Sequence, residues 1–200
     1  MPKISMVIPT YTINSNLEDL AVRAALSYKD QVDELIICED GGGFSKDLFE
    51  LADVYLFFKN NKGFSVNVNR GWKNASGDFV MIASSDTQLR KGDLNDLCIP
   101  GKVTSPHIQN QSIERLAGPF FVIPKEITAE RGMLMEEMRT YSSDSEYDHR
   151  VKDIFQKVPS VEIFHHQAQT VTAAGVEGGV EQQRDREIYQ KLIEEGRAAQ

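Results

Sequence analysis

The sequence lacks any run of apolar residues long enough to cross a lipid bilayer, so no membrane-spanning helix is expected. Its first ten residues also lack the basic, apolar and small-residue zones of a signal peptide. Cysteine is scarce: Cys38 and Cys98 have neither the number nor the spacing of a disulfide framework or a cysteine metal site. We therefore expect a cytoplasmic protein with two reduced thiols.

Basic residues are also few, since 22 lysines and arginines stand against 30 acidic residues and leave a net charge of -8. A protein that binds the phosphates of a nucleic acid usually has the opposite balance, so nucleic acid is not the expected partner. The G-x-G-x-x-G and Walker patterns are both absent, which argues against a dinucleotide or P-loop site. What remains, at 40% apolar and 26% charged residues, is the composition of one globular domain.

Four short apolar runs in the first ninety residues predict the strands of a parallel sheet. They are residues 4–8, 35–38, 54–58 and 79–83, and such runs are typical of strands buried on both faces. Residues 17–28 predict a crossover helix capped within 14–16, and residues 64–75 predict a weaker helix, interrupted by Gly71, that places Trp72 in the core. The fold class that follows is α/β: an open, Rossmann-like, mostly parallel sheet with helices on both faces.

Polar and flexible residues follow each of the four runs. They are Pro9, Thr10 and Tyr11; Glu39 and Asp40 with three glycines; Asn60 and Asn61; and Ser84, Ser85 and Asp86. In an open α/β sheet, ligands bind outside the carboxyl ends of the strands. Turn-forming residues alone explain any single one of these loops. The four loops together predict one polar cleft.

Several of these segments occur in the order found in the family 2 glycosyltransferases of the GT-A fold. They are ISMVIPTY, ELIICEDGG, NKGFSVNVNRGWKNASGDFVMIASSD and, further on, YSSDSEYDHR and IFHH. The chain resembles a compact, single-domain member of that family over residues 4–170, most strongly in the first ninety. The resemblance implies one GT-A catalytic domain over residues 1–176, with a nucleotide-sugar-binding half (1–90) and an acceptor and catalytic half (91–176). A C-terminal helix over residues 177–200 would follow.

The resemblance also implies which residues bind the nucleotide of a sugar donor. The positions that match the family's nucleotide-binding loops are Pro9, Thr10, Tyr11, Glu39, Asp40, Asn61, Gly63, Asn67 and Asn69. Glu39 and Asp40 stand where the family usually has an Asp-Asp pair, whose carboxylate contacts the base, commonly uracil. Val68 departs from the pattern, because the family has an arginine there. The implied donor is a nucleotide-diphosphate sugar, with a UDP-sugar favoured.

Ser84, Ser85 and Asp86 stand where the family carries an Asp-x-Asp motif for a divalent cation and for the ribose and diphosphate of the donor. The resemblance makes Asp86 the metal-facing residue and shows that Ser84 has replaced the first aspartate. His165 or His166 falls where the family often places a histidine on the metal or the diphosphate. Adjacent residues in a strand point to opposite sides, so only one of the two can reach the cleft. The implied cofactor is Mn²⁺ or Mg²⁺.

Asp144 falls on the aspartate that acts as the general base in the family, so the resemblance implies that it accepts the proton of the acceptor hydroxyl. The same stretch predicts a helix N-terminus, with Ser142 or Ser143 as its cap and acidic residues in its first turn. Asp148 lies four residues further on the same helical face and is the nearest rival for the role.

These features predict an inverting, metal-assisted glycosyltransferase of the hexosyltransferase type. It would move a sugar to a hydroxyl of a glycan, a lipid-linked or another acceptor. The alternative is a non-catalytic nucleotide-sugar-binding protein with a degenerate GT-A site, because Val68, Ser84 and Ser143 depart from the family pattern. A sugar-phosphate nucleotidyltransferase is disfavoured, because no glycine-rich basic loop follows the first strand. Residues 180–195 predict an amphipathic helix that packs on the domain or on a second subunit of a homodimer.

Overall fold

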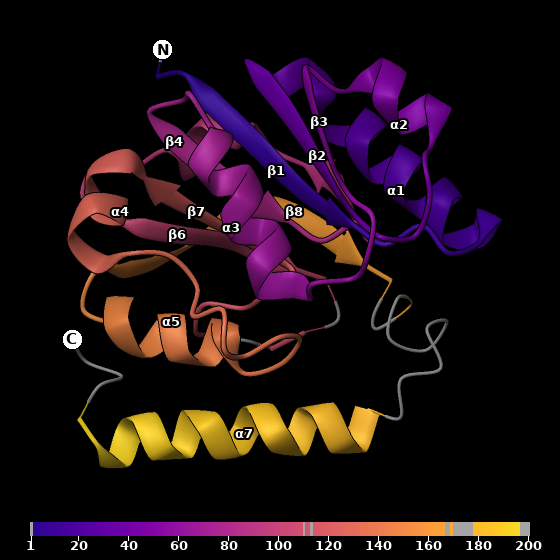
Figure 1. Cartoon of the computed structure of the whole chain (residues 1–200). Helices are drawn as coiled ribbons and strands as arrows, with labels where there is room; N and C mark the ends of the chain where they lie inside the picture. Colours follow the sequence, from indigo (N-terminus) through magenta and orange to yellow (C-terminus); the bar gives the residue numbers. More distant parts are fainter. Residues whose placement is uncertain (1, 110, 113, 167–168, 170–177, 197–200) are drawn as a thin grey trace.

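The computed structural model describes residues 2–109, 111–112, 114–166, 169 and 178–196, and these residues form one eight-stranded sheet covered by helices (Figure 1). The strand order is β3-β2-β1-β4-β7-β6-β8-β5. The strands are β1 (Ile4–Thr10), β2 (Glu34–Asp40), β3 (Val54–Phe58), β4 (Phe79–Ala83), β5 (Thr87–Lys91), β6 (Val103–Ile108), β7 (Phe120–Pro124) and β8 (Phe155–His165). The predicted α/β class is confirmed.

The first four strands form the parallel part of the sheet, as their apolar runs predict. Val7 of β1 pairs with Ile36 of β2 on one side and with Ile82 of β4 on the other. The second half of the sheet is mixed, because β7 runs antiparallel to both β4 and β6, and β5 runs antiparallel to β8. Since β6 and β8 pair in parallel again, the sheet keeps four parallel pairings among its seven.

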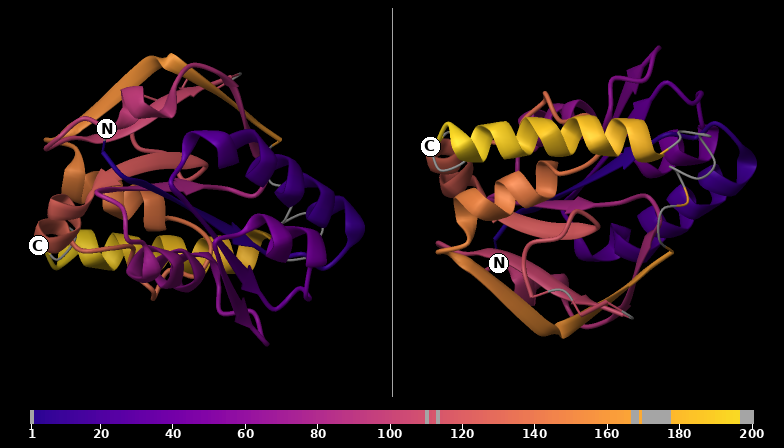
Figure 2. Two further views of the ribbon diagram at one scale, coloured as in Figure 1. Left: turned by 90° about the horizontal axis from the view of Figure 1, so that it is seen from above. Right: turned by 90° about the horizontal axis from the view of Figure 1, so that it is seen from below.

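Helices cover both faces of this sheet, so that alternate residues of each central strand enter two separate cores (Figure 2). The helices are α1 (Ser15–Tyr28), α2 (Lys46–Leu51), α3 (Phe64–Asn74), α4 (Lys125–Arg131), α5 (Ser143–Val151) and α7 (Gly178–Glu194), with short 3₁₀ turns at Lys29–Gln31 and Leu94–Leu97. Met6 packs with Ala24 and Tyr28 of α1, whereas Val7 faces the opposite core with Trp72 of α3. This alternation follows from the two-residue period of a strand.

Helix α1 begins where its sequence predicts. The side chain of Asn14 accepts a hydrogen bond from the backbone N–H of Leu17 at 3.0 Å, so Asn14 is the cap. The helix buries the expected apolar residues, except that Leu20 is only half-buried. Strand β3 differs from its prediction: Phe57 is 44% exposed, because β3 is the outermost strand and pairs only with β2.

The C-terminal helix α7 packs on its own domain rather than standing apart (Figure 1). Leu192 of α7 and Met138 form a small buried apolar contact, and the hydroxyl of Tyr189 donates to the carbonyl of Ser145 in α5 at 3.3 Å. Of the predicted domain boundary and terminal helix, residues 170–177 and 197–200 lie outside the described residues. In the described part of the chain, no helix combines the length and the apolar character that a bilayer span requires.

Gly71 lies inside α3 and does not interrupt it, contrary to the expectation from sequence. A methyl group at this position would meet Val7 Cγ1 at 2.4 Å and Cys38 Sγ at 2.6 Å, so α3 approaches β1 and β2 closely only because residue 71 has no side chain. Trp72 beside it is 4% exposed and stacks edge-on against Tyr147, which confirms its place in the core.

We predict that Gly71→Ala destabilises the protein. Overpacking of a core lowers stability by about 1–3 kcal/mol. Replacing glycine by alanine in a helix raises stability by up to about 1 kcal/mol through helix propensity, so the cost of overpacking is larger. Urea unfolding of the variant measures the loss. The matched control is Gly179→Ala in α7, where a methyl group meets nothing within 4 Å and stability should stay the same or rise. Equal stability of Gly71→Ala and the unchanged protein would contradict the close approach of α3 to the sheet.

Candidate functional site

A cleft of about 570 Å³ opens at the edge of the sheet where β1, β2 and β4 end. The predicted site residues that line it are Pro9, Thr10, Tyr11, Asp40, Asn61, Gly63, Asn67, Ser84, Ser85, Asp86, Asp144 and His165. The structure therefore brings together all the predicted site residues except Glu39, Asn69 and His166. Those three lie behind the surface of the cleft and do not line it, so each needs a different account.

Glu39 is fully buried beneath the cleft, where it links two loops. Its carboxylate accepts hydrogen bonds from the hydroxyls of Thr10 at 2.7 Å and Thr12 at 2.9 Å, and from the backbone N–H of Gly42 at 2.7 Å. The loop after β1 and the loop after β2 are thereby held together. In this structure Glu39 is thus a loop-positioning residue that does not line the cleft, and its contact with the nucleotide base stays a prediction.

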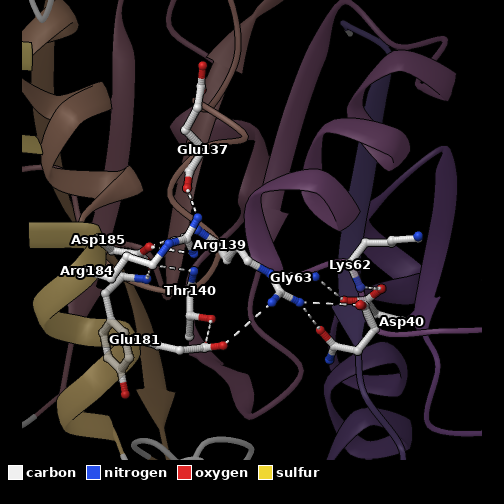
Figure 3. Close-up of polar contacts among 11 residues, drawn as sticks. Asp40, Lys62, Gly63, Glu137, Arg139, Thr140, Glu181, Arg184 and Asp185 are labelled. Carbon is white, nitrogen blue, oxygen red and sulfur yellow. Dashed lines mark hydrogen bonds and ion pairs between the residues drawn. The ribbon is translucent and has the colours of Figure 1, made fainter. Parts of the chain in front are cut away.

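Asp40, the next residue, does line the cleft. Its two carboxylate oxygens accept the backbone N–H groups of Lys62 at 2.7 Å and Gly63 at 2.9 Å (Figure 3). Burial raises the pKa of Asp40, and these two hydrogen bonds partly oppose that rise. Each carboxylate oxygen has a second lone pair. Asp40 can therefore hold the turn before α3 and still accept a hydrogen bond from a ligand.

The two asparagines of α3 have different surroundings. Asn69 is tied to the backbone of Leu134 by hydrogen bonds of 2.7 and 3.1 Å, so it fixes a neighbouring segment and does not reach the cleft, contrary to its prediction. Asn67 donates to the carbonyl of Cys38 and lines the cleft. Its side-chain oxygen is buried and has no hydrogen-bond partner among the described residues. A buried acceptor without a partner is costly, and this oxygen is closed to solvent, so a ligand in the cleft could donate to it only after the side chain had moved.

Asp86 and His165 meet at the opposite end of the cleft from Asp40, because β5 pairs with β8 directly after Asp86. His165 Nε2 lies 3.3 Å from Asp86 Oδ1, and the side chain of Gln111 contacts His165 Nδ1 at 3.0 Å. His166 turns away: its ring packs edge-on against Phe164, and only its backbone N–H reaches the carbonyl of Asp86. Of the two candidate histidines, His165 is therefore the one that lines the cleft, and His166 does not line it.

The chemistry of Asp86 and His165 fits a divalent cation that is shared with a ligand. In the described part of the chain, no group of three or more histidine, cysteine or acidic side chains is placed to hold an ion. Mg²⁺ and similar cations are commonly held by one or two carboxylates together with the phosphates of a substrate. One carboxylate and one imidazole would suffice for such a shared cation. The amide nitrogen of Gln111 lies 3.0 Å from Nδ1 of His165 and can only donate there, so Nε2 would have to lose its proton before it bound the cation.

Asp144 lies in the first turn of α5 and faces the cleft. Its Oδ2 accepts the backbone N–H of Gly118 at 3.1 Å and lies 3.9 Å from Arg115 Nη1, while its Oδ1 accepts the backbone N–H of Ser145 at 2.9 Å. Ser142 occupies the N-cap position of α5, as one of the two expected serines, but it has a positive φ of 62° and its side chain makes no capping bond. Asp148 does not line the cleft: its carboxylate accepts the backbone N–H of Leu116 at 2.8 Å.

Residues 139–143 and helix α7 form one wall of the cleft, and the sequence patterns did not predict this wall. The residues concerned are Arg139, Thr140, Tyr141, Ser142, Ser143 and, from α7, Glu181. Arg139 precedes Asp144 by five residues, which is the only signal in the sequence that it belongs near the site. Nothing in the sequence pattern places Glu181 there, because its position depends on how α7 packs.

We predict that Glu39→Ala lowers the free energy of unfolding by at least about 3 kcal/mol, since two hydroxyls and a backbone N–H lose their buried acceptor. Chemical denaturation measures the change. The control is Glu50→Ala, which removes an exposed i,i+4 pair with Lys46 and should cost less than about 1 kcal/mol. Similar losses in the two variants would show that Glu39 does not hold the loops.

A comparison with protein families gives a match to the first half of the chain. The family model described as Glycosyl transferase family 2 matches residues 5–98, the part that contains β1 to β4 and Asp86. A comparison with curated proteins finds no significant match.

Solved structures share the fold at low sequence identity. TarS 1-349 of S. aureus in complex with UDP matches with a TM-score of 0.64 and 14% identity, over 81% of this chain and 60% of that one. The mannosyltransferase PcManGT from Pyrobaculum calidifontis, in complex with GDP-Man and Mn²⁺, matches with a TM-score of 0.63 and 14% identity, over 84% and 58%. GalNAc-T7 with UDP, GalNAc and Mn²⁺ matches with a TM-score of 0.67 and 13% identity, over 82% and 43%.

This chain therefore spans between 43% and 60% of the length of those three structures. The sequence match covers the parallel half of the sheet, and the structural matches cover about four fifths of the chain. Together they show that residues 5–98 match the family 2 glycosyltransferase model and that the chain has the GT-A fold, as its motifs predict.

Proposed function

We propose that the protein is an inverting glycosyltransferase that moves a sugar from a nucleotide-diphosphate donor, with a UDP-sugar favoured, to a hydroxyl of an acceptor. The observation that carries this proposal is the convergence of Asp40, Asp86 and Asp144 on one cleft from three distant parts of the chain. Structures with the same fold have UDP or GDP-Man bound, which supports a nucleotide donor.

The nucleoside side of the donor would lie against the ends of β1, β2 and α3. The cleft there offers the carboxylate of Asp40 as an acceptor for the N–H and O–H groups of a nucleoside. Asn61 and Gly63 line the same end of the cleft. A φ of 98° at Gly63 lets the backbone turn before α3, where a side chain would meet Arg139 at 2.9 Å.

The diphosphate would lie near Asp86 and His165, the two residues that would hold a divalent cation. Such a cation, when bound, stabilises the negative charge that a diphosphate gains as it leaves. Ser84 and Ser85 line the same part of the cleft and can hydrogen-bond to phosphate or ribose oxygens. This arrangement supports a metal-assisted reaction with Mn²⁺ or Mg²⁺.

Asp144 is the proposed general base. Its carboxylate would accept the proton of the acceptor hydroxyl while that oxygen forms a bond to the anomeric carbon of the sugar. The bond between the anomeric carbon and the diphosphate oxygen breaks, and its electron pair stays on the diphosphate. Attack from the face opposite the leaving group inverts the anomeric centre. The backbone N–H groups of Gly118 and Ser145 hold the carboxylate in place, and such positioning contributes much of the rate.

The acceptor would approach from the second half of the chain, which supplies Gly118, Pro119 and Asp144 to the cleft. We therefore place the donor half in residues 1–90 and the acceptor half in residues 91–176, within one catalytic domain over residues 1–176. A glycan, a lipid-linked or another hydroxyl acceptor is compatible with this division. The cytoplasmic location and the homodimer remain predictions.

A non-catalytic nucleotide-sugar-binding protein is the second candidate. One observation favours it: Ser84 replaces a carboxylate, so that only Asp86 and His165 of the described side chains remain at the proposed cation site. Such a protein would bind the donor in the same cleft without transferring its sugar. Nucleotide affinity measured by calorimetry, together with the absence of any transfer or hydrolysis, would distinguish it from an enzyme.

We predict that Asp144→Asn lowers the rate of donor hydrolysis, assayed with a panel of UDP-hexoses, by about 10²–10⁴-fold. Binding of UDP should stay unchanged, because the variant keeps the shape of the side chain. The control is Asp148→Asn, which lies one helical turn away and outside the cleft, and which should keep its activity. Undiminished turnover by Asp144→Asn would remove Asp144 from the role of base.

We also predict that Mn²⁺ strengthens the binding of UDP and that Asp86→Asn or His165→Ala abolishes this strengthening. Calorimetric titrations of UDP with and without Mn²⁺ measure the effect. His166→Ala serves as the control, because His166 adjoins the site without lining the cleft. If Mn²⁺ acted equally on the Asp86→Asn variant and the unchanged protein, the cation would be held elsewhere.

A further inference from the structure

Helix α7 lines the cleft through Glu181 and contacts the adjoining segment 139–141 through Asp185, one helical turn further on (Figure 3). Residues four apart lie on the same face of a helix, so both side chains face the segment 139–141. This part of the chain lies beyond the region of the family match, which ends at residue 98. The contact between α7 and the cleft is therefore a feature of this chain that the family match does not assign.

Asp185 holds the backbone of the segment. It is fully buried, and its carboxylate accepts the backbone N–H groups of Thr140 and Tyr141, each at 2.9 Å, and of Arg139 at 3.3 Å. A buried carboxylate needs several such donors to remain charged. Three successive N–H groups on one carboxylate fix the path of the chain at this point of the cleft wall.

Glu181 holds the side chains of the same segment. One oxygen accepts the hydroxyl of Thr140 at 3.0 Å, and the other lies 3.8 Å from Arg139 Nη1. Arg139 Nη2 lies on the other side, 3.4 Å from both the carbonyl and the side-chain oxygen of Asn61. The guanidinium of Arg139 therefore lies between Glu181 of α7 and the loop before α3 (Figure 3). Both Glu181 and Asn61 line the cleft.

Arg139 is also the only lysine or arginine among the described residues that line the cleft. Four carboxylates line it as well: Asp40, Asp86, Asp144 and Glu181. A guanidinium has five N–H donors, and the contacts to Glu181 and Asn61 leave some of them for a ligand. A nucleoside placed against Asp40 and Asn61 brings carbonyl and hydroxyl oxygens within the reach of this side chain.

We propose that Arg139 contacts the nucleoside part of the donor and that α7 positions it through Glu181 and Asp185. The inference rests on the proposed function, because it needs a nucleotide in the cleft. Helix α7 thereby completes the donor site, whereas the chemistry takes place at Asp86 and Asp144. Arg139 acts by binding, and Glu181 acts through Arg139 as a positioning residue.

The test measures the binding of UDP and of UMP to four variants by calorimetry. Arg139→Ala should weaken both nucleotides by at least about tenfold, as expected for a hydrogen bond to a charged group. Arg139→Lys should recover part of the affinity, because it keeps the charge but not the planar fork. Glu181→Gln should weaken both nucleotides by about two- to fivefold, in line with a partly exposed ion pair. The control Glu187→Gln changes an exposed carboxylate of α7 and should leave binding unchanged.

Donor hydrolysis gives a second readout. Loss of an interaction that is equal in the ground and transition states raises KM and leaves kcat unchanged. Arg139→Ala should show this pattern, whereas a general disturbance of the cleft would lower kcat as well and would overturn the proposal. Thermal unfolding of each variant checks that the fold is kept. If Arg139→Ala does not fold, the affinities and the KM of Arg139→Lys are used to test the role of Arg139.

The outcomes separate this inference from the proposed function. Failure of the unchanged protein to bind either nucleotide would overturn the proposed function. Binding by the unchanged protein and equally by Arg139→Ala would overturn only the role of Arg139. Weakening of UDP without weakening of UMP would place Arg139 on the terminal phosphate and overturn the contact with the nucleoside. Equal affinities of Glu181→Gln and Glu187→Gln would overturn the role of α7.

Discussion

The parallel pairing of β1 with β2 and β4 is the constraint on which the site depends. Because the three strands run in one direction, their carboxyl ends lie at one edge of the sheet, and the residues that follow them emerge side by side. The register of the β1–β2 pair also decides which individual residues meet at this edge, since Thr10 at the end of β1 pairs with Glu39 of β2. The hydrogen bond between those two side chains, at 2.7 Å, then joins the loops that line the cleft.

The buried and half-buried acidic residues of this chain divide into those with structural contacts alone and those that also line the cleft. Glu39 and Asp185 each accept several hydrogen bonds from loops, and Glu146 forms a buried ion pair with Arg150. Removing one partner of such a hydrogen bond or ion pair leaves the other polar group buried and unpaired, which is destabilising. These carboxylates therefore hold neighbouring segments in fixed positions. Asp40 and Asp144 also accept backbone N–H groups, but they line the cleft. The protein thus positions these cleft-lining carboxylates with the same kind of backbone hydrogen bonds that it uses for the structural ones.

The sequence predicts the parallel half of the fold well, because apolar runs and loop residues are local signals. The runs at residues 4–8 and 79–83 became central strands, and Asn14 became the cap of α1. The sequence does not predict how closely segments that are distant in the chain approach one another, or which side chains then reach the cleft. Glu39 and Asp40 are neighbours in a motif, yet the pleat of β2 places one beneath the cleft and the other at its surface. Glu181 has no motif at all, and only the packing of α7 brings it to the cleft.

The charges around the cleft bear on how a donor and a cation would bind together. Four carboxylates line the cleft and Arg139 is the one lysine or arginine there among the described residues, so the field opposes a diphosphate. A cation between Asp86, His165 and the diphosphate would reverse that local balance. Two protein ligands bind a cation weakly when no phosphate completes the set. By linkage, each partner would then raise the affinity of the other by the same factor.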